Sequence, residues 1–163
     1  MYYLIDGYNF LFSLLDSKQS LSSQREKIIL FIQEKFAYLH LKGSLIFDGA
    51  RRRDEESGLS YPSPLEVVYT PKGQTADAYI LEKLEVSKKK EQFTVVTNDR
   101  GLIANCRPLG ARIISNTHLL IWLEKKKKNQ QKTKDKMIDT KYNIDRLLKA
   151  FEEKLKKEDN NSF

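Results

Sequence analysis

Residues 2–9, Tyr-Tyr-Leu-Ile-Asp-Gly-Tyr-Asn, open the chain with four aromatic or aliphatic side chains that stop at an acid and a glycine. Aromatic and β-branched residues favour a buried β-strand, and an Asp-Gly pair favours a turn. This stretch therefore predicts that a strand begins the fold, that a turn follows it, and that Asp6 lies at the carboxyl end of that strand.

Short apolar runs that end at turn residues recur along the chain and predict four further strands, over residues 44–47, 65–69, 93–97 and 111–114. Apolar residues at helical spacing between these runs predict helices from Ser23 to Gly43, from Thr75, from Gly101 to Cys106 and from about Asn116. For the first helix, Ser23 and Glu26 match a capping box. Because right-handed crossovers join alternating strands and helices, the order predicts an α/β fold with a mostly parallel sheet flanked by helices.

The last forty residues differ in composition from the rest of the chain. The formal net charge of the 163 residues is +7, and residues 124–163 contain thirteen Lys or Arg and eight Asp or Glu, so they carry +5 of it. We expect one domain over 1–124 and a basic linker with a C-terminal helix over 125–163. Such a surplus indicates either a polyanionic partner, RNA or the ribosome, or a solvated tail that aids solubility.

Cysteine and histidine usage restricts the classes of site. Cys106 is the single cysteine and there are two histidines, so neither an internal disulfide nor a Cys2His2 zinc site can form. Asp6 interrupts the first apolar run and no basic segment precedes it, unlike a signal peptide or a membrane-spanning helix. We expect a cytoplasmic protein with no membrane or disulfide partner. The sequence leaves the oligomeric state open.

Four aspartates fall where an α/β sheet binds its ligands. Asp6, Asp48 and Asp99 follow three of the predicted strands, and Asp77 opens a predicted helix. Each one alone could be a turn former or a helix cap. Because parallel strands lie about 4.8 Å apart, acids at the same strand ends converge, and they repel unless protons or a hard cation neutralise them. The four together therefore predict a site for Mg2+ or Mn2+.

Such a site suits hydrolysis of a phosphodiester by water. The sequence offers no strong Ser-His-Asp or Cys-His arrangement, whereas a carboxylate-held cation lowers the pKa of bound water and neutralises phosphate oxygens. Basic side chains follow the strand ends and could bind the flanking phosphates, although a solvated loop explains them equally well. These basic residues are Arg51, Arg52, Arg53, Lys72 and Arg100.

Four motifs resemble, in order, the YacP-like branch of NYN-domain ribonucleases in the PIN-like nuclease superfamily. The motifs are Asp6-Gly7-Tyr8-Asn9, Phe47-Asp48-Gly49, Thr75-Ala76-Asp77 and Thr97-Asn98-Asp99. The similarity runs from Tyr2 to about Leu123. It implies a PIN-like three-layer fold, Mg2+ or Mn2+, and endonucleolytic cleavage of RNA. We expect RNA as the partner, with ribosome-associated mRNA among the candidates. Gly49 stands where alanine would be equally acceptable, and Arg100 stands where a small polar residue is expected.

The resemblance also implies roles for individual residues. Asp6, Asp77 and Asp99 would hold the metal, with Thr75 and Thr97 supporting them. The implied catalytic set adds an outer acid and an orienting amide, and comprises Asp6, Asp48, Asp77, Asp99 and Asn9. The predicted substrate-binding set, in which the basic residues rest on their position after the strand ends, comprises Arg51, Arg52, Arg53, Lys72, Thr75, Asn98 and Arg100.

Four other classes of protein use related folds. A non-catalytic RNA- or ribosome-binding module would have the same fold, although the intact acids argue against it. An aspartyl phosphatase needs a second acid where Tyr8 stands, and a receiver domain needs a lysine where Ser115-Asn116 stands. A dinucleotide-binding domain needs a glycine-rich turn after the first strand, which residues 6–9 do not form.

Overall fold

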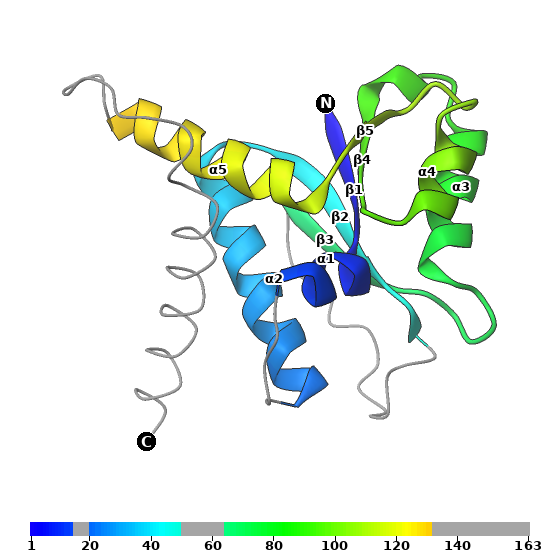
Figure 1. Cartoon of the computed structure of the whole chain (residues 1–163), viewed down its shortest axis with the longest axis horizontal. Helices are drawn as coiled ribbons and strands as arrows, with labels where there is room; N and C mark the ends of the chain where they lie inside the picture. Colours follow the sequence, from blue (N-terminus) through cyan, green and yellow to red (C-terminus); the bar gives the residue numbers. More distant parts are fainter. Residues whose placement is uncertain (15–19, 50–63, 132–163) are drawn as a thin grey trace.

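The computed structural model describes residues 1–14, 20–49 and 64–131 (Figure 1). Within them, one sheet has the strand order β3-β2-β1-β4-β5, and all its pairings are parallel. The strands are β1 (Tyr2–Asp6), β2 (Lys42–Phe47), β3 (Leu65–Tyr69), β4 (Phe93–Val96) and β5 (Arg112–Ile114). The predicted α/β fold with a parallel sheet is confirmed, and the first strand of the chain is the central one.

Helices cover both faces of this sheet (Figure 1). One face carries α1 (Gly7–Leu14), α2 (Leu21–Tyr38) and α5 (Asn116–Gln131), and the other carries α3 (Ala76–Val86) and α4 (Arg100–Cys106). A short 3-10 helix, η2 (Lys90–Gln92), precedes β4.

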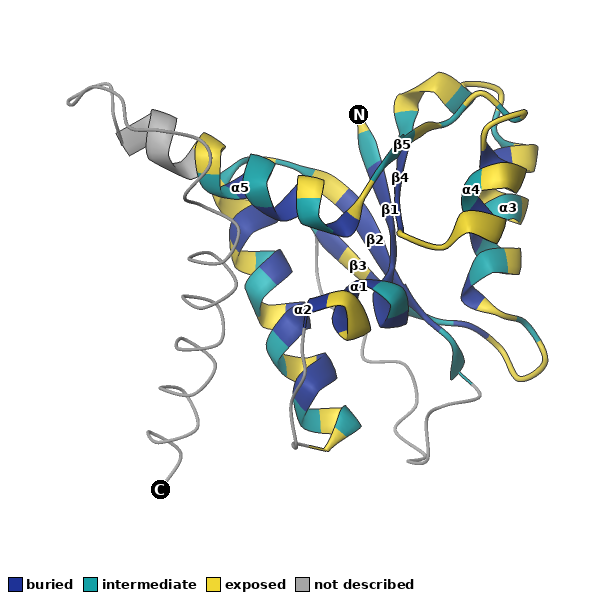
Figure 2. Cartoon of the chain, in the orientation of Figure 1, coloured by how far each residue is buried: buried dark blue, intermediate teal, exposed yellow. Residues whose placement is uncertain are grey.

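Two apolar cores result, because alternate side chains of a strand point to opposite faces. On β1, Tyr3 and Ile5 pack into the core under α1, α2 and α5, whereas Leu4 packs into the core under α3 and α4. Figure 2 shows the strands buried between these two layers of helices. The predicted three-layer arrangement is therefore confirmed.

The turn predicted at Asp6-Gly7 is wrong, because α1 begins directly at Gly7. The helix is stable there because Phe10, Leu11 and Leu14 are buried in the core. A side chain at Gly7 would not fit, since its Cβ would lie 2.6 Å from the Phe47 ring. Only a glycine lets the helix leave the strand this close to β2.

The first predicted helix starts and ends elsewhere. The Ser20 side chain caps α2 by accepting the Ser23 N–H at 3.3 Å, so the capping box expected at Ser23 and Glu26 lies inside the helix. The helix also stops at Tyr38, because Lys42–Ile46 pair with β1. Gly43 belongs to that strand, where a Cβ would lie 2.6 Å from the Tyr3 carbonyl oxygen. Strand pairing overrides local helical spacing at this boundary.

Helix α5 continues through the expected domain boundary at residue 124 and reaches Gln131. Glu124 contacts the body of the fold, since its Oε1 accepts a hydrogen bond from the buried Lys35 Nζ at 2.8 Å. Residues 132–163 lie outside the described residues, so a separate segment with a C-terminal helix stays a prediction. None of the described helices has the length and apolar character needed to cross a membrane.

Replacing Glu124 by alanine should lower the free energy of unfolding by about 2 kcal/mol. The side chain of Lys35 is only 5% exposed, so its ammonium would remain buried beside α5 without a carboxylate. Urea denaturation measures the effect, and Glu85→Ala makes the same charge change at an exposed position of α3. Equal denaturation midpoints for the two variants would show that the ion pair is unimportant for stability.

Candidate active site

Asp6 lies at the carboxyl end of the central strand and is 7% exposed. Its Oδ1 accepts the Asn9 N–H at 3.3 Å, and its Oδ2 accepts the Thr97 hydroxyl at 3.3 Å. Thr97 is fully buried after β4, and its Oγ1 in turn accepts the Asp99 N–H at 3.0 Å. Thr97 therefore ties the ends of β1 and β4 together and fixes Asp6 beside the segment that carries Asp99.

Three of the predicted acids share one electrostatic environment. Burial, together with the charges of Asp77 and Asp99, raises the pKa of Asp6 to about 6, although the hydrogen bonds from Asn9 and Thr97 act to lower it. Burial and then the charge of Asp99 also raise the pKa of Asp77. The fold thus brings together carboxylates from distant parts of the chain, since Asp6 and Asp99 are more than ninety residues apart. A cation bound among them would relieve their repulsion.

Helix caps hold Asp77 and Asp99 in place. The Thr75 side chain accepts the Ala78 N–H at 3.1 Å and caps α3, which carries Asp77 in its first turn. Asp99 itself caps α4, because its Oδ1 accepts the Leu102 N–H at 2.9 Å. A role in helix capping is therefore compatible with a role in the acid cluster. The caps orient Asp77 and Asp99, while the charges of these two acids still raise the pKa of Asp6.

Asp48 follows β2, the strand next to β1, but it is not among the charges with the largest effect on the pKa of Asp6. The neighbouring Gly49 donates its N–H to Thr70 Oγ1 at 3.1 Å. A Cβ at Gly49 would collide with the Thr70 carbonyl oxygen. The expectation that alanine would be equally acceptable there is therefore wrong, since the ends of β2 and β3 approach too closely for a side chain.

Three asparagines form a network beside the acids. Asn9 Oδ1 accepts the Asn98 N–H and an Asn116 Nδ2 hydrogen, both at 2.8 Å. Asn116 Nδ2 also lies 3.1 Å from the Asn9 carbonyl oxygen and 2.8 Å from Ser13 Oγ, and its backbone N–H donates to Asn98 Oδ1 at 3.1 Å. The network connects α1, the end of β4 and the start of α5. It explains how Asn9 is positioned.

Asn116 is the residue that sequence reasoning missed. Its side chain is fully buried. The backbone N–H of Asn98 can only donate, so the Asn9 side-chain atom that it contacts is the amide oxygen Oδ1. That oxygen accepts from Asn116, so the side-chain atom of Asn116 that faces it is the nitrogen Nδ2. Asn116 Oδ1 is the buried side-chain atom without a protein partner among the described residues. The sequence contained a signal for a role of Asn116 in the site, because this residue follows the last strand at the same sheet edge as the four acids.

The predicted basic residues are distributed unevenly. Arg100 opens α4 and Lys72 lies in the turn after β3, and both are exposed. Asn98 and Arg100 line a cavity between α4 and β5. Arg51, Arg52 and Arg53 lie outside the described residues. Of the two described basic residues, Arg100 directly follows Asp99 and Lys72 precedes the start of α3, which carries Asp77.

The donor atoms of this site are oxygens, which suits Mg2+ or Mn2+. Across residues 1–14, 20–49 and 64–131, no three His, Cys, Asp or Glu side chains converge closely enough to enclose a metal ion. Mg2+ does not require such a cage, because it retains several waters and takes one or two carboxylates plus substrate phosphates. Asp6 with Asp77 or Asp99 fits that requirement.

Comparisons with known proteins agree with this architecture. The model of the YacP-like NYN domain matches residues 3–160. The crystal structure of Rae1 (YacP) from Bacillus subtilis superposes with a TM-score of 0.66 at 22% identity, over 99% of this chain and 88% of that one. Its W164L mutant gives a TM-score of 0.62 at 20% identity, over 97% and 99%. A comparison with curated proteins found no match.

The two crystal structures support the fold, and the family match extends beyond Leu123, where the motif similarity stopped, into the basic segment. Proteins of this family are nuclease-like and related to RNA, and the family usually uses divalent metals. With residues 3–160 matched and the three-layer fold in place, the chain belongs to the YacP-like NYN-domain family.

Proposed function

We propose that this protein is a metal-dependent endoribonuclease that hydrolyses RNA phosphodiester bonds at the Asp6, Asp77 and Asp99 cluster. The observation that carries the proposal is that Asp6 is buried at the end of the central strand, where Asp77 and Asp99 lie close enough for their charges to raise its pKa. A buried carboxylate beside other negative charges is costly, and such an arrangement persists at sites where a cation or a reaction uses it. Family membership supplies the substrate class.

Each residue of the cluster has a distinct task in this proposal. Asp6, Asp77 and Asp99 would hold Mg2+ or Mn2+, which when bound supplies a water of lowered pKa and neutralises charge on the phosphate oxygens. Thr97 keeps the Asp6 carboxylate oriented through its hydroxyl, and Asn9 is kept in place by Asn98 and Asn116. Asp48 contributes from the neighbouring strand end as an outer acid.

Basic side chains would bind the phosphates on either side of the cut. Arg100 and Lys72 are exposed beside the segments that carry Asp99 and Asp77, which suits contacts with a flexible single strand. Arg51, Arg52 and Arg53 are proposed for the same role, and Thr75 and Asn98 complete the proposed substrate-binding set. We propose that the protein acts in the cytoplasm and that its RNA includes ribosome-associated mRNA.

Purified protein should cut labelled single-stranded or structured RNA in the presence of Mg2+ or Mn2+, and EDTA should stop the reaction. Asp77→Asn preserves side-chain volume but removes a charge, so it should lower the cleavage rate by at least about tenfold. The matched control is Glu85→Gln, the same exchange at an exposed position of the same helix. Cleavage that persists in EDTA would refute the metal-dependent mechanism.

The alternative function is a non-catalytic RNA- or ribosome-binding module with the same fold. The observation that favours it is that no group of three potential metal ligands converges within the described residues. Such a module would bind RNA in a salt-dependent way without cutting it under any metal condition. The cleavage assay, combined with a binding assay in EDTA, separates the two functions.

A further inference from the structure

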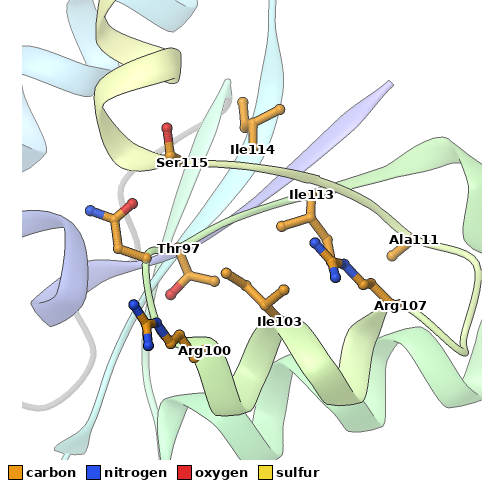
Figure 3. A pocket seen from close by; sticks show the side chains of 9 residues that line it. Thr97, Arg100, Ile103, Arg107, Ala111, Ile113, Ile114 and Ser115 are labelled. Atoms are coloured by element: carbon orange, nitrogen blue, oxygen red, sulfur yellow. The ribbon is translucent and has the colours of Figure 1, made fainter.

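A cavity of about 650 Å3 lies between α4 and β5, next to the proposed site. Figure 3 shows Arg100, Ile103 and Arg107 extending from the α4 region toward the segment that carries Ala111 and Ile113. The complete lining is Thr97, Asn98, Arg100, Ile103, Arg107, Ala111, Ile113, Ile114 and Ser115. Ile103, Arg107, Ala111 and Ile113 belong to neither the acid cluster nor the asparagine network, so the site described above gives this part of the cavity no role.

The cavity combines positive charge with an apolar wall. Arg100 and Arg107 are two helical turns apart, so they lie on the same side of α4, and both are exposed. The described residues that line the cavity include no Asp or Glu. Ile103 and Ile113 are partly buried and contribute apolar surface between the two guanidinium groups. An anionic ligand with a flat apolar part matches this composition.

The volume and position of the cavity further restrict the class of ligand that it could bind. Sites for small molecules and cofactors have volumes of roughly 300 to 1,000 Å3, a range that includes a nucleotide. Asn98 and Arg100 line the cavity and flank Asp99 in sequence, so a group bound there lies next to the segment that carries Asp99.

We propose that this cavity binds one nucleotide of single-stranded RNA beside the bond to be cut. The phosphates on its two sides contact Arg107 and Arg100, because guanidinium groups bind phosphate oxygens in a bidentate manner. Its base packs on Ile103 and Ile113. The assignment rests on the proposed function for the class of substrate, and it adds Arg107, Ile103 and Ile113 as residues that bind the substrate away from the acids.

Binding of a fluorescent six-nucleotide RNA, followed by anisotropy in EDTA, tests the charge of the cavity without cleavage. Arg107→Ala should weaken binding by about fivefold to tenfold and lower the salt slope by roughly 0.7. The matched control is Arg112→Ala. Arg112 is exposed on β5 and does not line the cavity. Burial raises the pKa of Tyr3, which packs in the core on the other face of the sheet, and the charge of Arg112 acts to lower that pKa. Equal weakening by both variants would overturn the assignment.

The nature of the ligand is tested from the RNA side with the wild-type protein. A six-unit chain with abasic linkers keeps the phosphates and loses the bases, so it should bind about fivefold more weakly than the RNA. Ala111→Leu reduces the space in the cavity without changing charge, and it should remove this difference. Equal binding of the two chains by wild-type protein would mean that the cavity does not hold a base, contrary to the proposal.

The two proposals fail in different ways. Metal-dependent cleavage together with equal weakening of RNA binding by Arg107→Ala and Arg112→Ala would leave the nuclease function intact and refute nucleotide binding in the cavity. Binding that depends on Arg107 and on the bases, in a protein that never cuts RNA, would support the cavity and refute the nuclease function.

Discussion

Replacing Asp6 by asparagine is expected to abolish metal-dependent RNA cleavage and, at neutral pH, to raise the free energy of unfolding by about 1 to 3 kcal/mol. The loss of cleavage follows from the proposed role of Asp6 as a metal-holding carboxylate. The gain in stability follows from burial, which raises the pKa of Asp6 from 3.8 to about 6, so its ionisation is costly in the folded protein.

The sign of the pH dependence follows from that pKa. Between about pH 4 and pH 6 the folded protein keeps a proton on Asp6 that the unfolded chain has released, so the stability of the wild type falls as pH rises through this window. Above pH 6 the full cost of ionisation is present. An asparagine does not ionise, so the variant should gain its advantage over the same window.

Urea denaturation at pH 4 and pH 8 measures this effect, alongside cleavage of labelled RNA at pH 8. The two proteins should be nearly equally stable at pH 4, apart from the altered hydrogen bond to Thr97, and the variant should be more stable at pH 8. Glu85→Gln makes the same exchange at an exposed position and should change neither property. An Asp6→Asn protein that still cuts RNA would exclude this residue from the metal-holding group.

Replacing Asn116 by aspartate is expected to lower the melting temperature by about 10 °C or more. The free energy of unfolding should fall by about 3 to 5 kcal/mol, which is the usual cost of burying an unpaired charge. The Nδ2 atom of Asn116 lies 2.8 Å from Asn9 Oδ1 and 3.1 Å from the Asn9 carbonyl oxygen. A carboxylate oxygen in that position would repel both acceptors. Because Asn116 is fully buried, water cannot screen the repulsion.

Thermal denaturation measures the effect, and Asn105→Asp provides the same exchange at an exposed position of α4. A milder variant, Asn116→Ala, should cost about 2 kcal/mol by leaving Asn9 without its buried donor. It should also lower the cleavage rate, because Asn9 would lose a contact that positions it beside Asp6. If Asn116→Asp melted within a degree or two of Asn105→Asp, the network would have no structural importance.

Much of the fold could be predicted from the sequence, because strands and helices depend on local periodicity. The strand at Leu65–Tyr69 and the helix after Thr75 match their predicted starts, since turn residues and a capping threonine mark them. Other boundaries could not be predicted. Helix α1 forms because the core buries Phe10, and the predicted first helix ends early because residues 42–46 pair with β1.

The amino-acid sequence by itself determined which residue types stand at the strand ends, and thus that an acidic edge was to be expected at Asp6, Asp48 and Asp99. The tertiary structure alone decided which of them share an electrostatic environment, that Asn116 joins Asn9, and that Gly49 admits no side chain. The physical reason is range. Periodicity and capping act within a few residues, whereas electrostatic coupling and close packing depend on the sheet order, which brings distant segments of the chain together.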